Sequence, residues 1–204
     1  MATGKRQRAA HLGPERRRPQ ILDAARRLAL RDSLAAVTFA SIAEELDVTR
    51  PTIYSCFPDR SALVDALIER EAGDLRAAVV AALLSVTDFR DAEQSFVDGL
   101  TALLRTVDTH GELWRFLLVA DPDDPRTRVV ASGRTEIARQ AGLLYGSVVP
   151  ASTEPLSSTE QALRLEFFMA SCESAVRLYL TSESWTKEQI AAVYGAALRR
   201  AVFP

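Results

Sequence analysis

Apolar residues recur at helical spacing along almost the whole chain, and no segment alternates as a half-buried strand does. The pattern is clearest near the C-terminus, where an apolar stripe keeps the i, i+3, i+4, i+7, i+8, i+11 spacing of one helix face. This stripe consists of Ile190, Val193, Tyr194, Ala197, Leu198 and Ala201. We therefore expect an all-α fold of about nine helices.

Bulk composition indicates a soluble, reduced, cytoplasmic protein. The longest apolar run, residues 77–84, is far shorter than the roughly 20 residues that a membrane helix needs. No apolar stretch follows the basic N-terminal residues, so we expect no signal peptide and no membrane partner. Cys56 and Cys172 lie far apart and lack metal-ligand spacing, so we expect neither a metal site nor a cofactor.

Charge is distributed unevenly along the chain. Residues 1–60 hold 11 Lys and Arg against 7 Asp and Glu, a net of +4, and residues 61–204 hold 14 against 20, a net of −6. A basic N-terminal segment followed by an acidic remainder favours a polyanionic partner that contacts only the first sixty residues. Random surface variation can also produce such a charge distribution. Residues 1–18 are basic without apolar periodicity and predict a flexible arm.

Three helices are expected in residues 19–62. The first begins at Pro19 and ends near Asp32, because Pro is tolerated in a first helical turn. Thr38 is a suitable N-cap for a second, short helix. Asp47-Val48-Thr49 forms a tight turn, and Thr49 caps a third helix with Pro51 in its first turn. Two short helices joined in this way predict a helix-turn-helix domain.

The remaining residues, 63–204, predict a larger helical domain with a cap at each helix start. Asp59 caps a long helix, Asp91 opens the next, and a separate short helix is expected from Glu112 to Val119. Asp124 with Pro125 starts another helix. Capping boxes are expected at Ser158 with Gln161 and at Thr186 with Gln189.

Residues 37–68, VTFASIAEELDVTRPTIYSCFPDRSALVDALI, carry the most specific motif of the chain. With the preceding Ile21-Leu22-x-Ala24-Ala25, this stretch resembles the N-terminal domain of the TetR family of transcriptional regulators. The resemblance covers residues 19–68; beyond them the chain matches the family only in length and helical pattern. It implies a homodimer that binds a double-stranded, near-palindromic DNA operator.

The third helix would lie in a major groove and present residue types that read DNA. Arg50 can pair with guanine, hydroxyl groups of Thr and Tyr can reach phosphates, and Pro51 can meet a thymine methyl group. The resemblance implies that Thr38 and Arg60 contact the DNA backbone. The expected DNA-binding residues are Thr38, Thr49, Arg50, Pro51, Thr52, Tyr54 and Arg60. Alternatively, Tyr54 packs on Phe57 and Arg50 is a solvated surface charge.

Three positions depart from the family pattern. Glycine is common where Ser33 and Asp47 stand, at helix ends that favour a left-handed backbone, which Asp tolerates better than Ser. An aromatic residue is usual where Cys56 stands. These departures leave the fold unchanged but bear on the DNA register.

The resemblance also implies a dimer interface on the last two helices and a small-molecule pocket whose occupancy controls DNA binding. Expected pocket residues, for an apolar or aromatic effector, are Phe96, Trp114, Phe116, Tyr145, Phe168 and Cys172. Expected interface residues are Leu165, Val176, Tyr179, Ile190, Val193, Tyr194, Ala197, Leu198 and Ala201. Both sets can equally be ordinary core of a single chain.

Other functional classes have less support. Only His11 and His110 are present, and no nucleophile elbow, phosphate loop or paired-carboxylate motif occurs, so we expect no enzyme. A repressor released by an effector is the favoured prediction. An architectural or activator protein without a small-molecule effector, and a helical interaction module without DNA binding, remain as alternatives.

Overall fold

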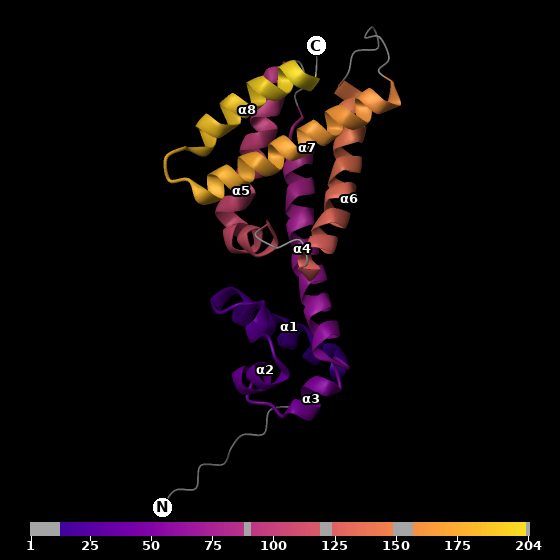
Figure 1. Cartoon of the computed structure of the whole chain (residues 1–204), viewed down its shortest axis with the longest axis vertical. Helices are drawn as coiled ribbons and strands as arrows, with labels where there is room; N and C mark the ends of the chain where they lie inside the picture. Colours follow the sequence, from indigo (N-terminus) through magenta and orange to yellow (C-terminus); the bar gives the residue numbers. More distant parts are fainter. Residues whose placement is uncertain (1–12, 88–90, 119–123, 149–156, 203–204) are drawn as a thin grey trace, which may run out of the picture. The chain divides into compact units, whose positions relative to one another are not determined.

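The computed structural model describes residues 13–87, 91–118, 124–148 and 157–202, and only the backbone of residues 125, 144–148 and 202. Within these ranges every regular element is helical, so the all-α prediction is confirmed (Figure 1). The elements are α1 Pro14–Arg31, η1 Leu34–Ala36, α2 Phe39–Glu45, α3 Arg50–Tyr54, α4 Arg60–Leu84, α5 Ala92–Leu118, α6 Pro125–Val148, α7 Ser158–Thr181 and α8 Lys187–Val202.

The expected separate helix at 112–119 is instead the end of α5. The backbone at His110, with φ −130° and ψ 27°, leaves the helical region and kinks α5 there. Gly111 follows directly, and glycine weakens a helix interior. The described residues therefore contain eight α-helices rather than nine, because a kink stands where a complete break was expected.

Backbone contacts divide the chain into two compact units, residues 1–70 and 71–204. The division falls within α4, so the first turns of this helix belong to the N-terminal unit. That unit has a dense core of fully buried side chains from α1, α2, α3 and α4. Its largest members are Ile21, Ile42, Ile53, Phe57, Leu63 and Leu67.

Helix α1 begins at Pro14 with Gly13 as N-cap, not at the expected Pro19. The expected flexible arm is therefore wrong for its last residues, and residues 1–12 lie outside the described part. Two arginines explain the longer helix. Arg17 is buried, and Arg18 lies 4.3 Å over the Phe57 ring while its Nη1 donates to the Cys56 carbonyl at 2.7 Å.

Most expected helix caps are present. Backbone amides at the helix starts donate to the side chains of Asp59, Asp91 and Asp124, and Thr186 with Gln189 forms the expected reciprocal pair. The box at the start of α7 was expected at Ser158 with Gln161. It is formed one residue earlier, by Ser157 and Glu160, where a glutamate carboxylate is the stronger acceptor for a backbone amide.

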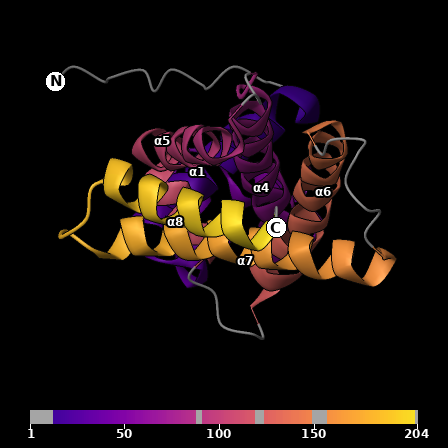
Figure 2. The ribbon, with the colours of Figure 1, turned by 90° about the horizontal axis from the view of Figure 1, so that it is seen from above.

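In the C-terminal unit, α5 packs against both α7 and α8, and α7 and α8 lie side by side (Figures 1 and 2). Gly195 of α8 lies directly against α5. A Cβ atom at this position would lie 2.6 Å from Val97 Cγ2 and 3.0 Å from the Val97 backbone nitrogen. Only a glycine allows α8 to lie this close to α5.

We expect Gly195→Ala to lower the free energy of unfolding by about 1–3 kcal/mol, because α5 and α8 must move apart to admit the methyl group. Urea unfolding followed by circular dichroism measures this change. Gly142→Ala is the matched control. A Cβ atom there meets only Leu165 Cδ2 at 4.0 Å, so higher helix propensity should leave stability unchanged or raise it by up to about 1 kcal/mol. Equal effects of the two variants would show that the close approach carries no strain.

Candidate DNA-reading helix and effector cavity

Helix α2 is fixed at its start by a reciprocal cap. The Ser41 amide donates to Thr38 Oγ1 and the Thr38 amide donates to Ser41 Oγ, each at 3.1 Å. Ser41 Oγ also donates to the Ala36 carbonyl at 2.7 Å. The expected cap is therefore confirmed, and its second member is Ser41.

The turn between α2 and α3 depends on a left-handed residue. Asp47 has φ 49°, the only positive φ of a non-glycine residue in the described part, and the Val48 amide then donates to the Ala43 carbonyl at 2.9 Å. Asp tolerates this conformation better than most residues. Ser33, which tolerates a left-handed backbone less well, has a φ of 172°, which is extended backbone, so the chain after α1 differs from the glycine pattern and serine is unstrained there.

Helix α3 has one anchored and one open face. Ile53 is completely buried and holds the helix against the core of the unit. Arg50, Pro51 and Tyr54 are exposed, and Thr52 is half-buried. Thr49, the N-cap residue, makes no side-chain bond to a backbone amide; its hydroxyl lies 3.1 Å from that of Thr52. The expected reading residues thus share a solvent-facing surface.

Tyr54 combines packing with exposure. Its ring meets Phe39 of α2 edge-on, with centroids 4.7 Å apart, while 58% of the residue remains accessible. The packing partner is therefore Phe39 and not the alternative Phe57. Edge-to-face contact fixes the ring and leaves its hydroxyl free to reach a phosphate.

Arg60 supports the start of α2 from the first turn of α4. Its Nε donates to the Val37 carbonyl and its Nη2 to the Leu34 carbonyl, both at 2.7 Å. These bonds hold the segment that carries Thr38. Arg18 has a similar positioning role on the carbonyl of Cys56, just after α3. Sequence reasoning missed Arg18 because this residue lies in the segment taken for a flexible arm.

The expected interface residues divide between the interior of the chain and its surface. Val176, Ile190 and Leu198 are almost fully buried within the chain, Leu165 lines the cavity described below, and Tyr179 donates its hydroxyl to Asp108. Val193, Ala197 and Ala201 are exposed, and the half-buried Tyr194 lies 2.9 Å from Ser174 Oγ through its hydroxyl.

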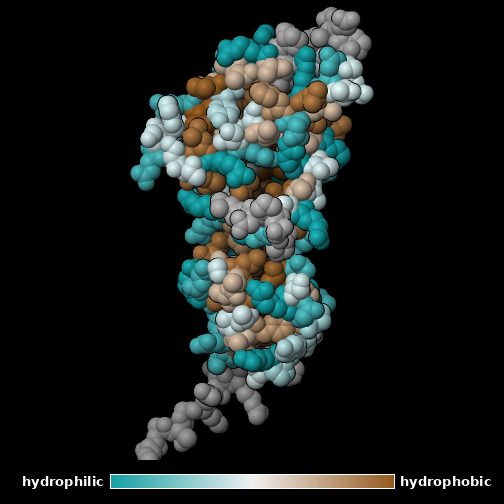
Figure 3. Space-filling view, viewed as in Figure 1, coloured by the Kyte–Doolittle hydropathy of each residue, from teal (hydrophilic) through white to brown (hydrophobic). Residues whose placement is uncertain are grey.

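Two large apolar side chains of α7 are also exposed. Val193 is 68% exposed, Leu163 64% and Phe167 47%. Figure 3 shows hydrophobic residues among hydrophilic ones over α7 and α8. We call Leu163, Phe167, Val193, Ala197 and Ala201 the outer α7–α8 face.

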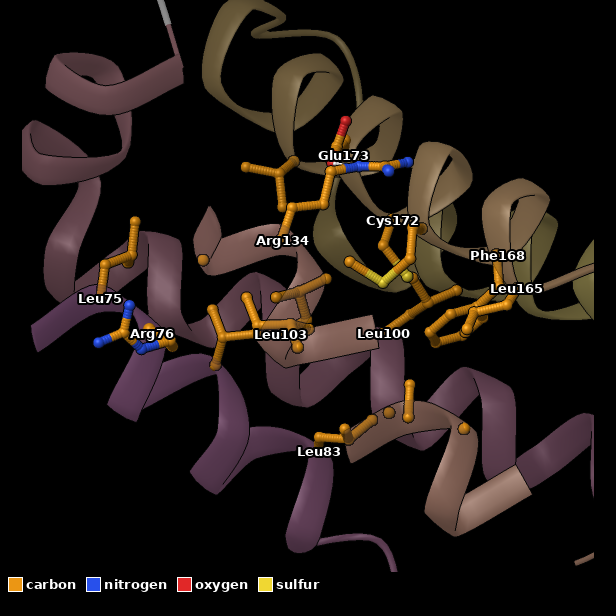
Figure 4. Close-up of a pocket in the computed structure, with 18 of the residues that line it drawn as sticks. Leu75, Arg76, Leu83, Leu100, Leu103, Arg134, Leu165, Phe168, Cys172 and Glu173 are labelled. Carbon is orange, nitrogen blue, oxygen red and sulfur yellow. Dashed lines mark hydrogen bonds and ion pairs between the residues drawn. The ribbon is translucent and has the colours of Figure 1, made fainter. Parts of the chain in front are cut away.

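The C-terminal unit also contains a partly open cavity of about 490 Å³, within the usual size range of small-molecule sites. Residues of α4, α5, α6 and α7 line it (Figure 4). Four expected pocket residues, Phe96, Trp114, Phe168 and Cys172, belong to the lining. Phe116 instead lies under the Arg126 guanidinium, 5.1 Å from the ring centroid, and the side chain of Tyr145 lies outside the described part.

Arg134 connects α6 to α7 beside the cavity. Its guanidinium donates to both Glu166 oxygens at 2.6 and 2.8 Å and to Glu173 at 2.7 Å. The Arg134 hydrogen bonds lower the pKa of Glu166. Burial and the neighbouring Glu173 raise the pKa of the Cys172 thiol to about 12, so this cysteine stays protonated and unreactive at neutral pH.

We expect acid to weaken the C-terminal unit. Hydrogen bonds from Arg139 and Gln140 lower the pKa of Glu136 to about 2, and Arg126 and Lys187 lower those of Asp124 and Asp108. Because the folded state holds these protons less tightly than the unfolded chain, their stabilisation is complete above about pH 4.5. It is lost as the pH falls toward about 2. The urea concentration at the midpoint of unfolding should decrease when the pH is lowered from about 6 to about 3, and it should decrease less in Arg139→Gln. A midpoint that stays constant with pH would contradict this expectation.

The described residues contain neither a metal-binding cluster nor a membrane-spanning helix. No three His, Cys, Asp or Glu side chains gather there as a metal site would require. None of the helices in that part combines the length and the apolar character needed to cross a bilayer.

Comparison with known proteins identifies the fold. Residues 21–67 match the family described as bacterial regulatory proteins, tetR family. A tetR-family transcriptional regulator from Streptomyces coelicolor is 22% identical over 93% of this chain and 82% of its own, with a TM-score of 0.68. A TetR-like regulator from Rhodococcus sp. RHA1 is 20% identical over 92% and 97%, with a TM-score of 0.63.

A third similar structure is that of RolR in complex with resorcinol, 22% identical over 92% of this chain and 87% of its own, with a TM-score of 0.52. At these identities the likeness is one of fold. No curated protein matches the sequence significantly.

Proposed function

We propose that this chain is a transcriptional repressor of the TetR family, whose model its residues 21–67 match. In this proposal it binds a near-palindromic operator as a homodimer, and a small-molecule effector releases it. The proposed DNA-binding residues are Thr38, Thr49, Arg50, Pro51, Thr52, Tyr54 and Arg60.

The open face of α3 carries the proposal. Ile53 anchors the helix, and the exposed Arg50 and Tyr54 offer a guanidinium for base edges and a hydroxyl for phosphates. The part-buried hydrogen bonds of Arg18 and Arg60 to backbone carbonyls hold the chain on either side of α3. A rigidly held helix with an exposed polar face suits entry into a major groove.

The outer α7–α8 face supports a homodimer. Three large apolar side chains on it remain exposed in the single chain, and a second copy can cover them in a symmetric contact. We therefore place the interface on Leu163, Phe167, Val193, Ala197 and Ala201, with Tyr194 at its edge. Val176, Ile190 and Leu198 serve the core of each chain.

The cavity supports control by an effector. It lies in the unit that also carries the proposed dimer face, and four helices contribute to its wall. RolR, of similar fold, has been crystallised with the small phenol resorcinol, so a fold of this kind admits a small ligand. An occupant that prefers one arrangement of the wall would shift the protein toward that arrangement.

Selection of bound sequences from random duplex DNA tests the proposal. We expect a consensus of two inverted half-sites, whose centres lie about 34–36 Å apart, one turn of DNA, or further if the reading helices are set wider. Enrichment of a single, unpaired half-site would contradict the dimer. If DNA is bound but no consensus is enriched, the result would favour an architectural protein. If no DNA is bound at all, the result would favour a helical interaction module.

A further inference from the structure

The cavity wall is mostly apolar, and its charged side chains are mostly positive; Ser95, Ser158 and Gln161 are its uncharged polar members. Three arginines, Arg76, Arg134 and Arg164, and one glutamate, Glu173, belong to it. Arg134 is fully engaged by Glu166 and Glu173, and Arg164 has interactions of its own. Arg76 differs from both.

Among the described residues, none forms a hydrogen bond or an ion pair with the Arg76 guanidinium. The charge of Arg76 contributes to the lowered pKa of Glu136 of α6, whose carboxylate accepts hydrogen bonds from Arg139 at 2.7 and 2.9 Å and from Gln140 at 3.1 Å. Arg76 therefore brings a positive charge to the cavity, and no side chain of the described residues accepts a hydrogen bond from it.

Two glycines, which have no side chain, leave space around this guanidinium. Its two terminal nitrogens lie 3.9 Å from the positions that Cβ atoms would take at Gly73 and at Gly133. Gly133 faces Arg76 from α6 and is itself part of the cavity lining. A larger residue at 133 would fill the room in which an anion could approach the guanidinium.

Arg76 lies apart from the aromatic part of the wall. Figure 4 shows Arg76 toward one side of the view and Leu165 and Phe168 toward the other, with Leu103 and Leu100 between them. Phe168 stands against Phe96, with ring centroids 6.2 Å apart. The cavity thus has Arg76, with Leu75 beside it, toward one side and the aromatic Phe168 with Leu165 toward the other (Figure 4).

We propose that this cavity binds an amphipathic carboxylate, with the anionic group on Arg76 and the alkyl or aryl body against Leu100, Leu103, Leu165 and Phe168. A guanidinium forms charge-assisted, two-pronged bonds with a carboxylate, and these strengthen where water is excluded. The inference rests on the proposed function, because it names the chemical class of the effector.

Direct binding of three decyl probes tests this inference. Trp114 lines the cavity, with its indole nitrogen donating to Thr106 Oγ1 at 3.0 Å, so its fluorescence reports occupancy once the exposed Trp185 is changed to Phe. Decanoate, decan-1-ol and decylammonium are titrated below their micelle-forming concentrations. We expect decanoate to bind at least about tenfold more tightly than decanol, and decylammonium most weakly. From octanoate to decanoate, affinity should rise about fourfold per methylene.

Arginine variants separate a specific contact from general charge. Arg76→Gln should weaken decanoate binding about 10- to 100-fold and leave decanol binding unchanged, which also shows that the cavity is intact. Arg128→Gln removes an exposed arginine of α6 outside the lining and should change neither. Equal affinity for decanoate and decanol, binding of no probe, or an equal loss in both variants would overturn the inference.

The outcome is independent of DNA binding. If decanoate binds through Arg76 but leaves the operator complex intact, the ligand class stands and effector release fails. If the operator complex dissociates with another ligand while decanoate does not bind, the proposed function stands and this inference fails.

Discussion

In Val193→Arg, we expect a monomer that binds the operator at least about 100-fold more weakly than the wild-type protein. Val193 is the most exposed of the large apolar side chains in the described part. In a two-fold interface one substitution places two arginines on the covered face, and burial of unpaired charge costs several kcal/mol. A monomer retains only one half-site contact. Sedimentation equilibrium and operator titration measure the two effects.

Leu143→Arg is the matched control for this substitution. Leu143 is also exposed, at 62%, but lies on α6, outside the outer α7–α8 face. This variant should remain dimeric and bind DNA normally. Ala197→Arg should behave like Val193→Arg, because Ala197 lies one turn further along α8. A tight dimer in both α8 variants would move the interface elsewhere.

In Arg50→Ala, we expect specific operator binding to weaken by about 1–3 kcal/mol and the preference at one position of each half-site to relax. Arg50 is the first residue of α3 and is exposed. A lost base contact acts on one position, whereas a lost phosphate contact weakens binding to all sequences equally. Titration against operator variants that differ at single positions distinguishes the two.

Arg31→Ala serves as the control for Arg50→Ala. Arg31 is an exposed arginine at the end of α1, where it pairs with Asp32 and Glu45. Its removal should leave the preference at every operator position unchanged. If both variants relax the same position, or if Arg50→Ala changes no preference, Arg50 does not read a base.

Helix positions and most caps could be predicted because they depend on local chemistry. Thr38, Asp59, Asp91 and Asp124 cap the helices expected from their spacing, and Asp47 adopts the expected left-handed backbone. The box at α7 was displaced by one residue, since Ser157 and Ser158 are equally suitable N-caps and only the stronger acceptor at Glu160 decides between them.

Tertiary partners could not be predicted from periodicity. The stripe Ile190 to Ala201 is one helical pattern, but Ile190 and Leu198 lie in the core of the chain while Val193 and Ala197 face outward. Spacing shows that a face is apolar and does not show what covers it. The same applies to Phe116, which packs under Arg126 and not in the cavity, and to Arg18, whose partners Cys56 and Phe57 are distant in sequence.

Affinity for the selected palindrome, compared with that for a scrambled duplex of equal composition at two salt concentrations, shows whether this chain reads a DNA sequence. A site-specific regulator should bind the palindrome about 10³-fold or more tightly at the higher salt concentration, because base contacts persist while non-specific phosphate contacts weaken. Equal affinity for both duplexes, falling together as salt increases, would show that the basic N-terminal residues bind DNA without reading it and would contradict the account.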